Sequence, residues 1–145
     1  MKRELVKDWM TRDVLTITPD TSLPEAHRLM TNNNIRRLPV VKNDRLVGIV
    51  TLGDVREAEP SDATSLSIWE MNYLLSKLKV EKIMTKNPIT IYANETIGEA
   101  AWVMLKNKIS GLPIIDSEKR VVGIITESDI FRVVVQEWRE LEPAF

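Results

Sequence analysis

GIVTLGDV (48–55) reappears as GIITESDI (123–130), and this repeated stretch decides the fold. Each copy is a run of β-branched residues that ends in threonine, with an aspartate three positions after the threonine. A β-branched run is typical of a strand, and threonine followed by an acid at this spacing is typical of a capped helix start. The stretch therefore predicts, twice, a strand that passes directly into a helix.

The repeat extends outward from this stretch over most of the chain. At an offset of 74, VKDWMTRDVLTI (6–17) lies on VEKIMTKNPITI (80–91), and IRRLPVV (35–41) lies on ISGLPII (109–115). The offset becomes 75 after one residue is inserted in the turn that follows. Because a copy of roughly 55–60 residues buries little core by itself, two copies packed together form the natural stable unit.

Each copy predicts the element order β-α-β-β-α. A short helix precedes a brief strand, VLTI (14–17) or PITI (88–91), and a capping box then opens a helix at Ser22 and at Thr96. Two β-rich runs joined by a charged turn follow, which is typical of an antiparallel hairpin. We therefore predict an α+β fold in which two β-α-β-β-α repeats pack with pseudo-two-fold symmetry.

The segment between the copies has its own helical pattern. We place the first copy at residues 1–58, a helical linker at 59–79 and the second copy at 80–145. A loop is predicted from Pro60 to Ala63, and Ser67 with Glu70 forms another capping box. One face of the following helix is apolar, and we expect it to pack either on the repeats or on a partner chain; its residues are Ile68, Met71, Leu75 and Leu78.

Composition excludes several classes of function. The 145 residues are 43% hydrophobic, carry a formal net charge of −1 and include no cysteine. A balanced charge disfavours nucleic acid and anionic membranes as partners, and no apolar run is long enough to span a bilayer. The charged N-terminus lacks the apolar region of a signal peptide. We therefore expect a soluble, cytoplasmic protein without disulfides.

The tandem resembles a pair of cystathionine-β-synthase (CBS) domains, also called a Bateman module. The resemblance rests on Met-Thr near the start of each copy, the capped helix, the Leu-Pro run and the motif G-h-h-T-x-x-D-h, where h is apolar. The linker further resembles that of the acetoin-utilisation-protein type. Proteins of that type often carry an ACT domain after the pair, and we expect none here because the sequence ends at Phe145.

The T-x-x-D turn allows two interpretations that are compatible with each other. A threonine at the end of a strand and an aspartate three residues later form a helix cap, which needs no ligand. A carboxylate beside a helix N-terminus can also accept hydrogen bonds from a ribose diol while the helix amides attract phosphate. The family resemblance implies that Asp54 and Asp129 hold ribose hydroxyls in clefts between the repeats.

By the same resemblance, each copy supplies one adenine-nucleotide site. The first would comprise Thr16, Ile17, Arg36, Arg37, Leu38, Pro39, Thr51, Gly53 and Asp54. The second would comprise Thr90, Ile91, Ser110, Gly111, Leu112, Pro113, Thr126, Ser128 and Asp129.

The two predicted sites differ in charge. Arg36 and Arg37 precede the Leu-Pro pair of the first copy, whereas Ser110 and Gly111 stand there in the second. Guanidinium groups bind phosphate through paired, charge-assisted hydrogen bonds. We therefore expect the first site to bind phosphorylated ligands more tightly. The alternative is a solvated arginine pair beside a strand.

No catalytic or metal-binding constellation is visible in the sequence. His27 is the single histidine and is expected on a helix surface, and the four tryptophans are expected as core or interface anchors. We therefore predict a non-catalytic regulatory module that binds AMP, ADP, ATP or an S-adenosyl ligand, needs no cofactor or metal, forms a homodimer and signals to an unknown effector protein. The alternative is a ligand-independent dimerisation or assembly module.

Overall fold

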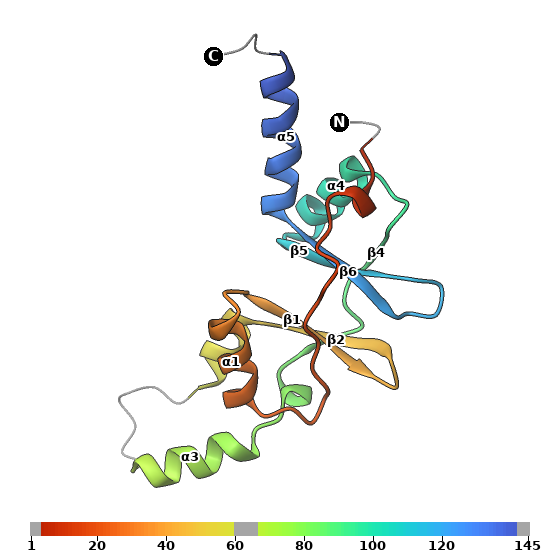
Figure 1. Ribbon diagram of the computed structural model, residues 1–145. Coiled ribbons are helices and arrows are strands. Elements are labelled where there is room, and N and C mark those ends of the chain that lie inside the picture. The colour runs from red at the N-terminus through yellow and green to blue at the C-terminus, as the bar shows by residue number, and fades with distance from the viewer. Residues whose placement is uncertain (1–3, 60–66, 142–145) are drawn as a thin grey trace. The chain divides into compact units, whose positions relative to one another are not determined.

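Two three-stranded sheets carry the two copies of the repeat (Figure 1). The computed structural model describes residues 4–59 and 67–141. The chain divides into two compact units, which we name after their central carboxylates. The Asp54 unit is Leu15–Pro88, and the Asp129 unit combines Met1–Val14 with Ile89–Phe145. The predicted loop from Pro60 to Ala63 lies outside the described residues.

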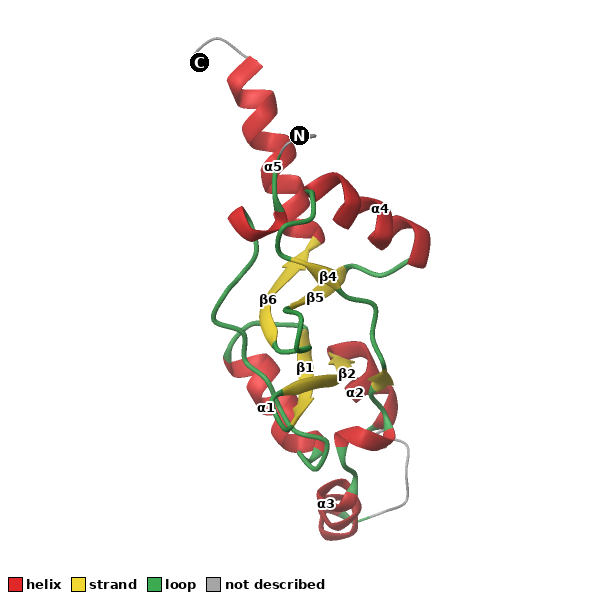
Figure 2. Ribbon diagram, turned by 90° about the vertical axis from the view of Figure 1, so that its right-hand side faces the viewer, coloured by secondary structure: helices red, strands yellow, loops and turns green. Residues whose placement is uncertain are grey.

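In the Asp54 unit, β1 and β2 form the predicted hairpin and β3 adds a third strand to β2. Helices α1 and α2 lie beside these strands, whereas α3 lies apart from them (Figure 2). The elements are α1 (Leu23–Asn32), β1 (Arg37–Lys42), β2 (Arg45–Thr51), α2 (Leu52–Ala58), α3 (Ile68–Lys77), the 3₁₀ turn η2 (Val80–Lys82) and β3 (Thr85–Lys86). The predicted strand at 14–17 pairs only at Ile17, which bridges Val40, and the chain then turns between Thr18 and Thr21.

The Asp129 unit repeats this plan. Its strand β4 is parallel to β5, and β5 pairs with β6 in the second predicted hairpin. The elements are the 3₁₀ turn η1 (Val6–Asp8), β4 (Ile91–Tyr92), α4 (Ile97–Asn107), β5 (Gly111–Ile115), β6 (Val121–Thr126) and α5 (Glu127–Leu141). Mixed helices and sheets in this order confirm the α+β fold class, with β4 shorter than predicted.

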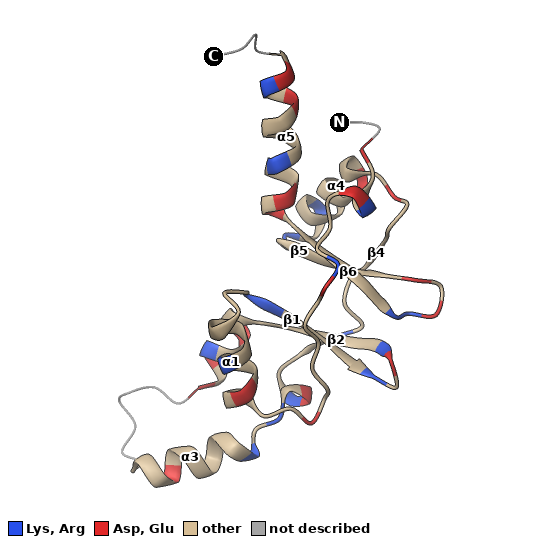
Figure 3. Cartoon of the chain, viewed as in Figure 1, with Lys and Arg blue, Asp and Glu red and all other residues tan. Residues whose placement is uncertain are grey.

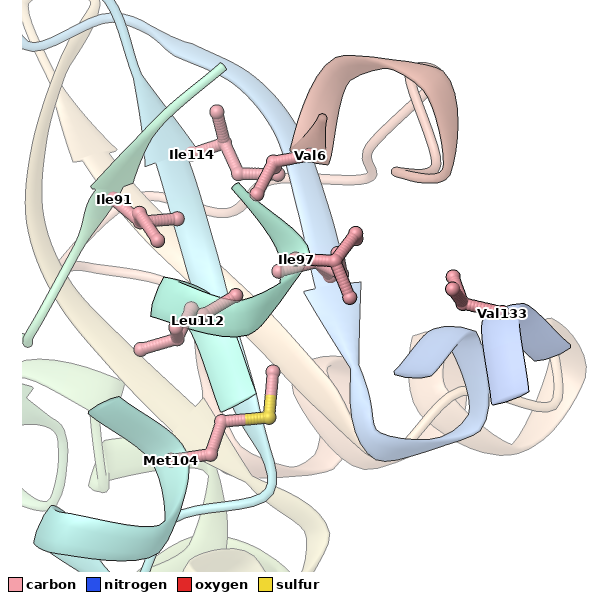
Figure 4. Close-up of a cluster of buried hydrophobic side chains, with 9 residues drawn as sticks. Val6, Ile91, Ile97, Met104, Leu112, Ile114 and Val133 are labelled. Atoms are coloured by element: carbon pink, nitrogen blue, oxygen red, sulfur yellow. The ribbon is translucent and has the colours of Figure 1, made fainter. Parts of the chain in front are cut away.

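The segment that opens each copy packs in the unit that holds the other copy's hairpin. Val6 is fully buried in the core of the Asp129 unit, where Figure 4 shows it beside Ile97 and Ile114. Val80, its counterpart in the repeat, is fully buried in the core of the Asp54 unit. Sequence repetition does not reveal this exchange, because the two valines occupy equivalent positions.

Backbone hydrogen bonds and close packing fix the exchanged segments. The Val6 amide donates to the Glu95 carbonyl over 2.9 Å, and Thr11 exchanges two bonds with Ile124. Met10 then lies against Gly123, where an added Cβ atom would be 2.5 Å from the Met10 sulfur. The Met84 sulfur is equally close to a Cβ built on Gly48. Each hairpin glycine is thus required by the methionine that packs on it.

The two hairpin turns differ by the inserted residue. Asn43 and Asp44 both have positive φ, 52° and 62°, which defines a two-residue type I′ turn. In the second hairpin the Asp116 carboxylate accepts hydrogen bonds from the amides of Glu118 and Arg120, both over 2.9 Å. The bond from the Arg120 amide is the main reason that the pKa of Asp116 lies below its ordinary value.

Helix α3 forms where the linker pattern predicts it, with Ser67 as its N-cap. No residue of this helix is buried, and most of its residues are uncharged (Figure 3). Of the predicted apolar face, Ile68 is 75% exposed, whereas Met71, Leu75 and Leu78 are half-buried, and Leu78 packs against the core of the Asp54 unit, so this face packs on the first unit only in part.

Candidate functional site

The turn between β2 and α2 is a complete capping box. Thr51 Oγ1 accepts a hydrogen bond from the Asp54 amide over 3.1 Å, and the Thr51 amide donates to Asp54 Oδ2 over 2.9 Å. The predicted helix cap is therefore confirmed for the first copy. Asp54 Oδ1 accepts no hydrogen bond from residues 4–59 or 67–141 and remains available to a ligand.

The corresponding turn of the second copy binds its aspartate differently. Asp129 Oδ2 accepts from the Thr126 amide over 2.9 Å and from Thr126 Oγ1 over 3.4 Å. Asp129 Oδ1 accepts from Arg132 Nη1 over 2.6 Å, one turn along α5. The Asp129 side chain is 7% exposed, whereas Asp54 is half-buried. Both oxygens of Asp129 are therefore engaged within the chain.

The predicted arginine pair lies next to the first turn. Arg37 pairs with Thr51 across β1 and β2, and the Arg36 carbonyl accepts from the Leu52 amide over 2.7 Å. The Arg36 side chain is exposed and makes no hydrogen bond or ion pair among the described residues, while Arg37 is half-buried. The hairpin register thus brings a cationic side chain to the same end of the sheet as the carboxylate.

The same register places Ser110 and Gly111 beside the second turn. Gly111 pairs with Thr126, and the Glu127 amide donates to the Ser110 carbonyl over 3.0 Å. Gly111 is buried, Ser110 is half-buried and Ser128 is exposed. No cation from this strand reaches the second turn, so the predicted difference in charge between the two copies persists at the level of local structure.

The predicted apolar residues lie further along each sheet and are mostly buried. Ile17 pairs with Val40, three residues from the Arg37–Thr51 pair, and Ile91 pairs with Ile114 in the same relationship. Thr16 and Gly53 are exposed, Thr90 is half-buried, and the buried members of the two predicted sites are Ile17, Leu38, Pro39, Ile91, Gly111, Leu112, Pro113 and Asp129. Only the exposed and half-buried members have side-chain surface that is open to a ligand within one unit.

His27 has a partner that sequence reasoning missed. Its Nδ1 atom lies 2.7 Å from Glu59 Oε1, and both side chains are about one-third exposed. The pair connects α1 to the C-cap residue of α2.

Within the described ranges, no three histidine, aspartate or glutamate side chains are placed to hold a metal ion. No helix in those ranges is both long and apolar enough to cross a bilayer.

Three of the four tryptophans are not core residues. Trp69, Trp102 and Trp138 are 84%, 58% and 52% exposed. Of the two predicted roles, core anchor or interface anchor, only the second fits these three residues. Trp9 is half-buried against the core of the Asp129 unit, and its indole N–H donates to Glu4 over 2.9 Å. A helical position and a large apolar side chain do not by themselves distinguish a core from an interface.

A groove between α4 and α5 was also not predicted. It has a volume of about 560 Å³ and lies entirely within the Asp129 unit. Its apolar lining comes mainly from Met104, Leu105, Ile109, Ile130 and Phe131. Its lining from α5 is confined to Glu127, Ile130 and Phe131, in the first five residues of that helix.

Comparison with known proteins gives one consistent family. The model of the CBS domain matches residues 6–61 and 80–136. A CBS domain-containing protein of Dictyostelium discoideum is 36% identical over 96% of this chain and 97% of its own length. Other curated relatives are longer. The chain spans 47% of a Methanocaldococcus jannaschii protein that is 35% identical, and 23% of an inosine-5′-monophosphate dehydrogenase of Korarchaeum cryptofilum that is 37% identical.

Solved structures agree in fold over nearly the whole chain. The CBS domain pair of protein MJ0100, in complex with 5′-methylthioadenosine and S-adenosyl-L-methionine, has a TM-score of 0.76 and 34% identity, with coverage of 92% and 97% of the two chains. Arabidopsis thaliana CBSX2 in complex with AMP has a TM-score of 0.77 and 27% identity, with coverage of 94% and 99%. A putative acetoin utilization protein (AcuB) of Vibrio cholerae has a TM-score of 0.75 and 29% identity, with coverage of 96% and 98%.

Proposed function

The chain belongs to the CBS-domain family, and from this membership we propose that it is a non-catalytic regulatory module that binds an adenosine-containing ligand. The observation that carries the proposal is the state of Asp54. Its Oδ1 atom is open at the start of α2, and the exposed Arg36 immediately precedes the neighbouring strand β1. A hydrogen-bond acceptor beside a cation is the pair of groups that a ribose phosphate needs.

The chemistry of the ligand follows from these two groups. An ionised carboxylate only accepts hydrogen bonds, so its natural partner is a group with donors, such as the vicinal hydroxyls of a ribose. Arginine presents a rigid fork of N–H donors that matches the oxygens of a phosphate. The relatives with bound ligands carry AMP in one case and 5′-methylthioadenosine with S-adenosyl-L-methionine in another, and all three compounds contain adenosine.

Calorimetric titration with a panel of adenosine compounds tests this proposal. The panel would hold adenosine, AMP, ADP, ATP, S-adenosylmethionine and 5′-methylthioadenosine, with GMP as the control for the base. Saturable binding that Asp54→Asn weakens is the expected result, because asparagine preserves the hydrogen bond from the Thr51 amide but removes the charge. If no member of the panel binds, and no nucleotide is found on the protein by native mass spectrometry, the proposal is wrong.

We further propose that the chain forms a homodimer through the outer face of α4 and α5 and passes its ligand state to another protein. This face is formed by Trp102, Leu105, Phe131, Val134, Val135, Trp138 and Leu141, whose exposed fractions range from 40% to 84%. Aromatic residues bury about 150–250 Å² each, so three of them supply a large part of the roughly 800 Å² per partner in a standard interface.

Among the described residues of the Asp54 unit, the matching positions of the repeat form no equivalent face. The positions that match Trp102, Leu105 and Phe131 in the repeat hold Arg28, Thr31 and Arg56, which are polar and exposed. A second copy of the chain would therefore bind face to face through the Asp129 unit, in a symmetric interface that uses the same patch on both partners.

The same surface favours the second candidate function, an assembly module that needs no ligand. A constant dimer mass in the absence of any measurable nucleotide binding would support that candidate.

A further inference from the structure

The two central carboxylates differ in how much of their hydrogen-bonding capacity is free. A carboxylate offers about four lone-pair positions to donors. Asp54 uses one of them, for the Thr51 amide. Asp129 uses three, for the Thr126 amide, the Thr126 hydroxyl and the Arg132 guanidinium. The oxygen that is open in Asp54, Oδ1, is the one that Arg132 occupies in Asp129.

The repeat explains why only one copy has this contact. Arg132 and Asp129 are three residues apart on α5, a spacing at which helical side chains face each other. The residue at the matching position of α2 is Glu57, which is exposed and carries no donor for Asp54. The difference therefore follows from a single substitution, glutamate in one copy and arginine in the other, at the same helical position.

We propose that Arg132 is a specificity-determining residue that occupies the ribose acceptor of the second site and so keeps it closed to an uncharged nucleoside. This assignment deepens the proposed nucleotide-binding function and rests on it. A ribose hydroxyl that approaches Asp129 Oδ1 must displace the Arg132 guanidinium, whose 2.6 Å hydrogen bond joins two ionised groups, and the hydroxyl offers only a neutral donor in exchange. At Asp54 the same hydroxyl meets an open oxygen.

Arg132 is able to release the carboxylate without unfolding the helix. Its side chain is 66% exposed, so the guanidinium has solvent into which it can rotate. A ligand that carries an anion close to α5 would draw the guanidinium away from Asp129, and the freed Oδ1 atom could then accept from the ribose. The second site would consequently discriminate for charged adenosine compounds and against adenosine itself, although its own strand supplies no cation.

The test compares adenosine binding in two backgrounds by calorimetry. In Asp54→Ala, which removes the first acceptor, adenosine is expected to bind weakly. In Asp54→Ala/Arg132→Met, affinity is expected to rise about three- to fivefold, the range in which exposed ion pairs contribute. Methionine preserves the length of the side chain and removes its donors. Arg139→Met on the same helix is the control, since Arg139 is exposed and makes no contact with Asp129.

A reciprocal variant tests the same idea in the other unit. Glu57→Arg places a donor three residues after Asp54 on α2, and it should weaken adenosine binding at the first site by a similar factor. Circular dichroism and thermal melting confirm that each variant is folded. Unchanged or weaker binding in Asp54→Ala/Arg132→Met overturns the role of Arg132, provided that the unmodified chain binds adenosine compounds through Asp54. If the unmodified chain and Arg132→Met both bind none of the panel, the proposed function and the role of Arg132 both fail.

Discussion

The sulfur of Met10 lies against the Cα atom of Gly123, so closely that a Cβ atom on the glycine would be only 2.5 Å from it. The Thr11 carbonyl oxygen would be 3.0 Å from the same Cβ atom. We therefore expect Gly123→Ala to lower the free energy of unfolding by about 1–3 kcal/mol, the usual cost of overpacking. Chemical denaturation measures the change.

Gly98 provides the matched control for that substitution. It lies in the first turn of α4, is exposed, and has no neighbour closer than 3.8 Å to an added Cβ atom. Gly98→Ala should leave stability unchanged or raise it by up to about 1 kcal/mol, because alanine loses less backbone entropy on folding. An equal loss of stability in both variants would contradict the packing argument.

Nucleotide binding at the first site should depend on Asp54. Removing a charged hydrogen-bond acceptor typically costs about 1.5–3 kcal/mol, which corresponds to roughly a ten- to hundredfold loss of affinity. Asp54→Ala also removes half of the capping box, so a loss of about 1 kcal/mol in stability accompanies it. Calorimetry with AMP, paired with thermal unfolding, separates the two effects. Asp129→Ala removes the carboxylate of the second copy, and it should leave AMP binding at the tighter first site unchanged.

Arg36 should distinguish phosphorylated ligands from adenosine. Its side chain is exposed and outside the helix cap, so Arg36→Ala should not affect stability. We expect AMP to bind about tenfold more weakly and adenosine to be unaffected, since only AMP has a phosphate for the guanidinium. The Arg36→Ala/Arg37→Ala variant should show the same selectivity. Lys42→Ala, at the opposite end of β1, is the control; equal effects of Arg36→Ala on both ligands would argue against a phosphate contact.

The mass of the chain in solution tests the proposed dimer. Light scattering at micromolar concentration should give about twice the 16.6 kDa of one chain. Phe131→Lys with Trp138→Lys should shift the mass to that of the monomer, because a charge in an apolar interface is costly to desolvate. Trp69→Lys on α3 should preserve the dimer. A monomer mass for the unmodified chain would exclude the interface.

Asp116 should make the second hairpin sensitive to acid. Because folding lowers the pKa of this carboxyl, its contribution to stability is present above the ordinary value of 3.8 and is lost as the pH falls through the lower folded value. Asp116→Asn should therefore be less stable than the unmodified chain at neutral pH. Urea unfolding between pH 2 and pH 6 should show this difference shrinking as the pH falls; a difference that is independent of pH would contradict the role of the charge.

The elements of the repeat could be predicted from the sequence because each is specified locally. Thr51 with Asp54 and Ser22 with Glu25 determine where helices begin, and alternating apolar residues identify the hairpin strands. The positions of Arg36 and Arg37 beside the first turn follow from the hairpin register alone. Such features depend on residues only a few positions apart, or on one antiparallel pairing.

Other features depend on choices that the sequence leaves open. Val6 and Val80 are equivalent in the repeat, so the pattern does not tell which hairpin each segment joins. The Arg132 contact depends on a side-chain rotamer within α5, and the His27–Glu59 pair depends on how α1 packs against the end of α2. The exposure of Trp102 and Trp138 depends on what covers α4 and α5, which a helical period does not specify.

The exchange of opening segments determines what happens when the chain is cut. A chain divided between α2 and α3 gives one fragment that carries Val6 and another that carries Val80. Each compact unit then contains polypeptide from both fragments, since Val6 packs with residues 89–145 and Val80 packs with residues 15–59. The halves of such a split protein should be unable to fold separately and should fold on mixing. We therefore expect the covalent link between the repeats to be dispensable for assembly, because the exchanged segments join the two fragments without it.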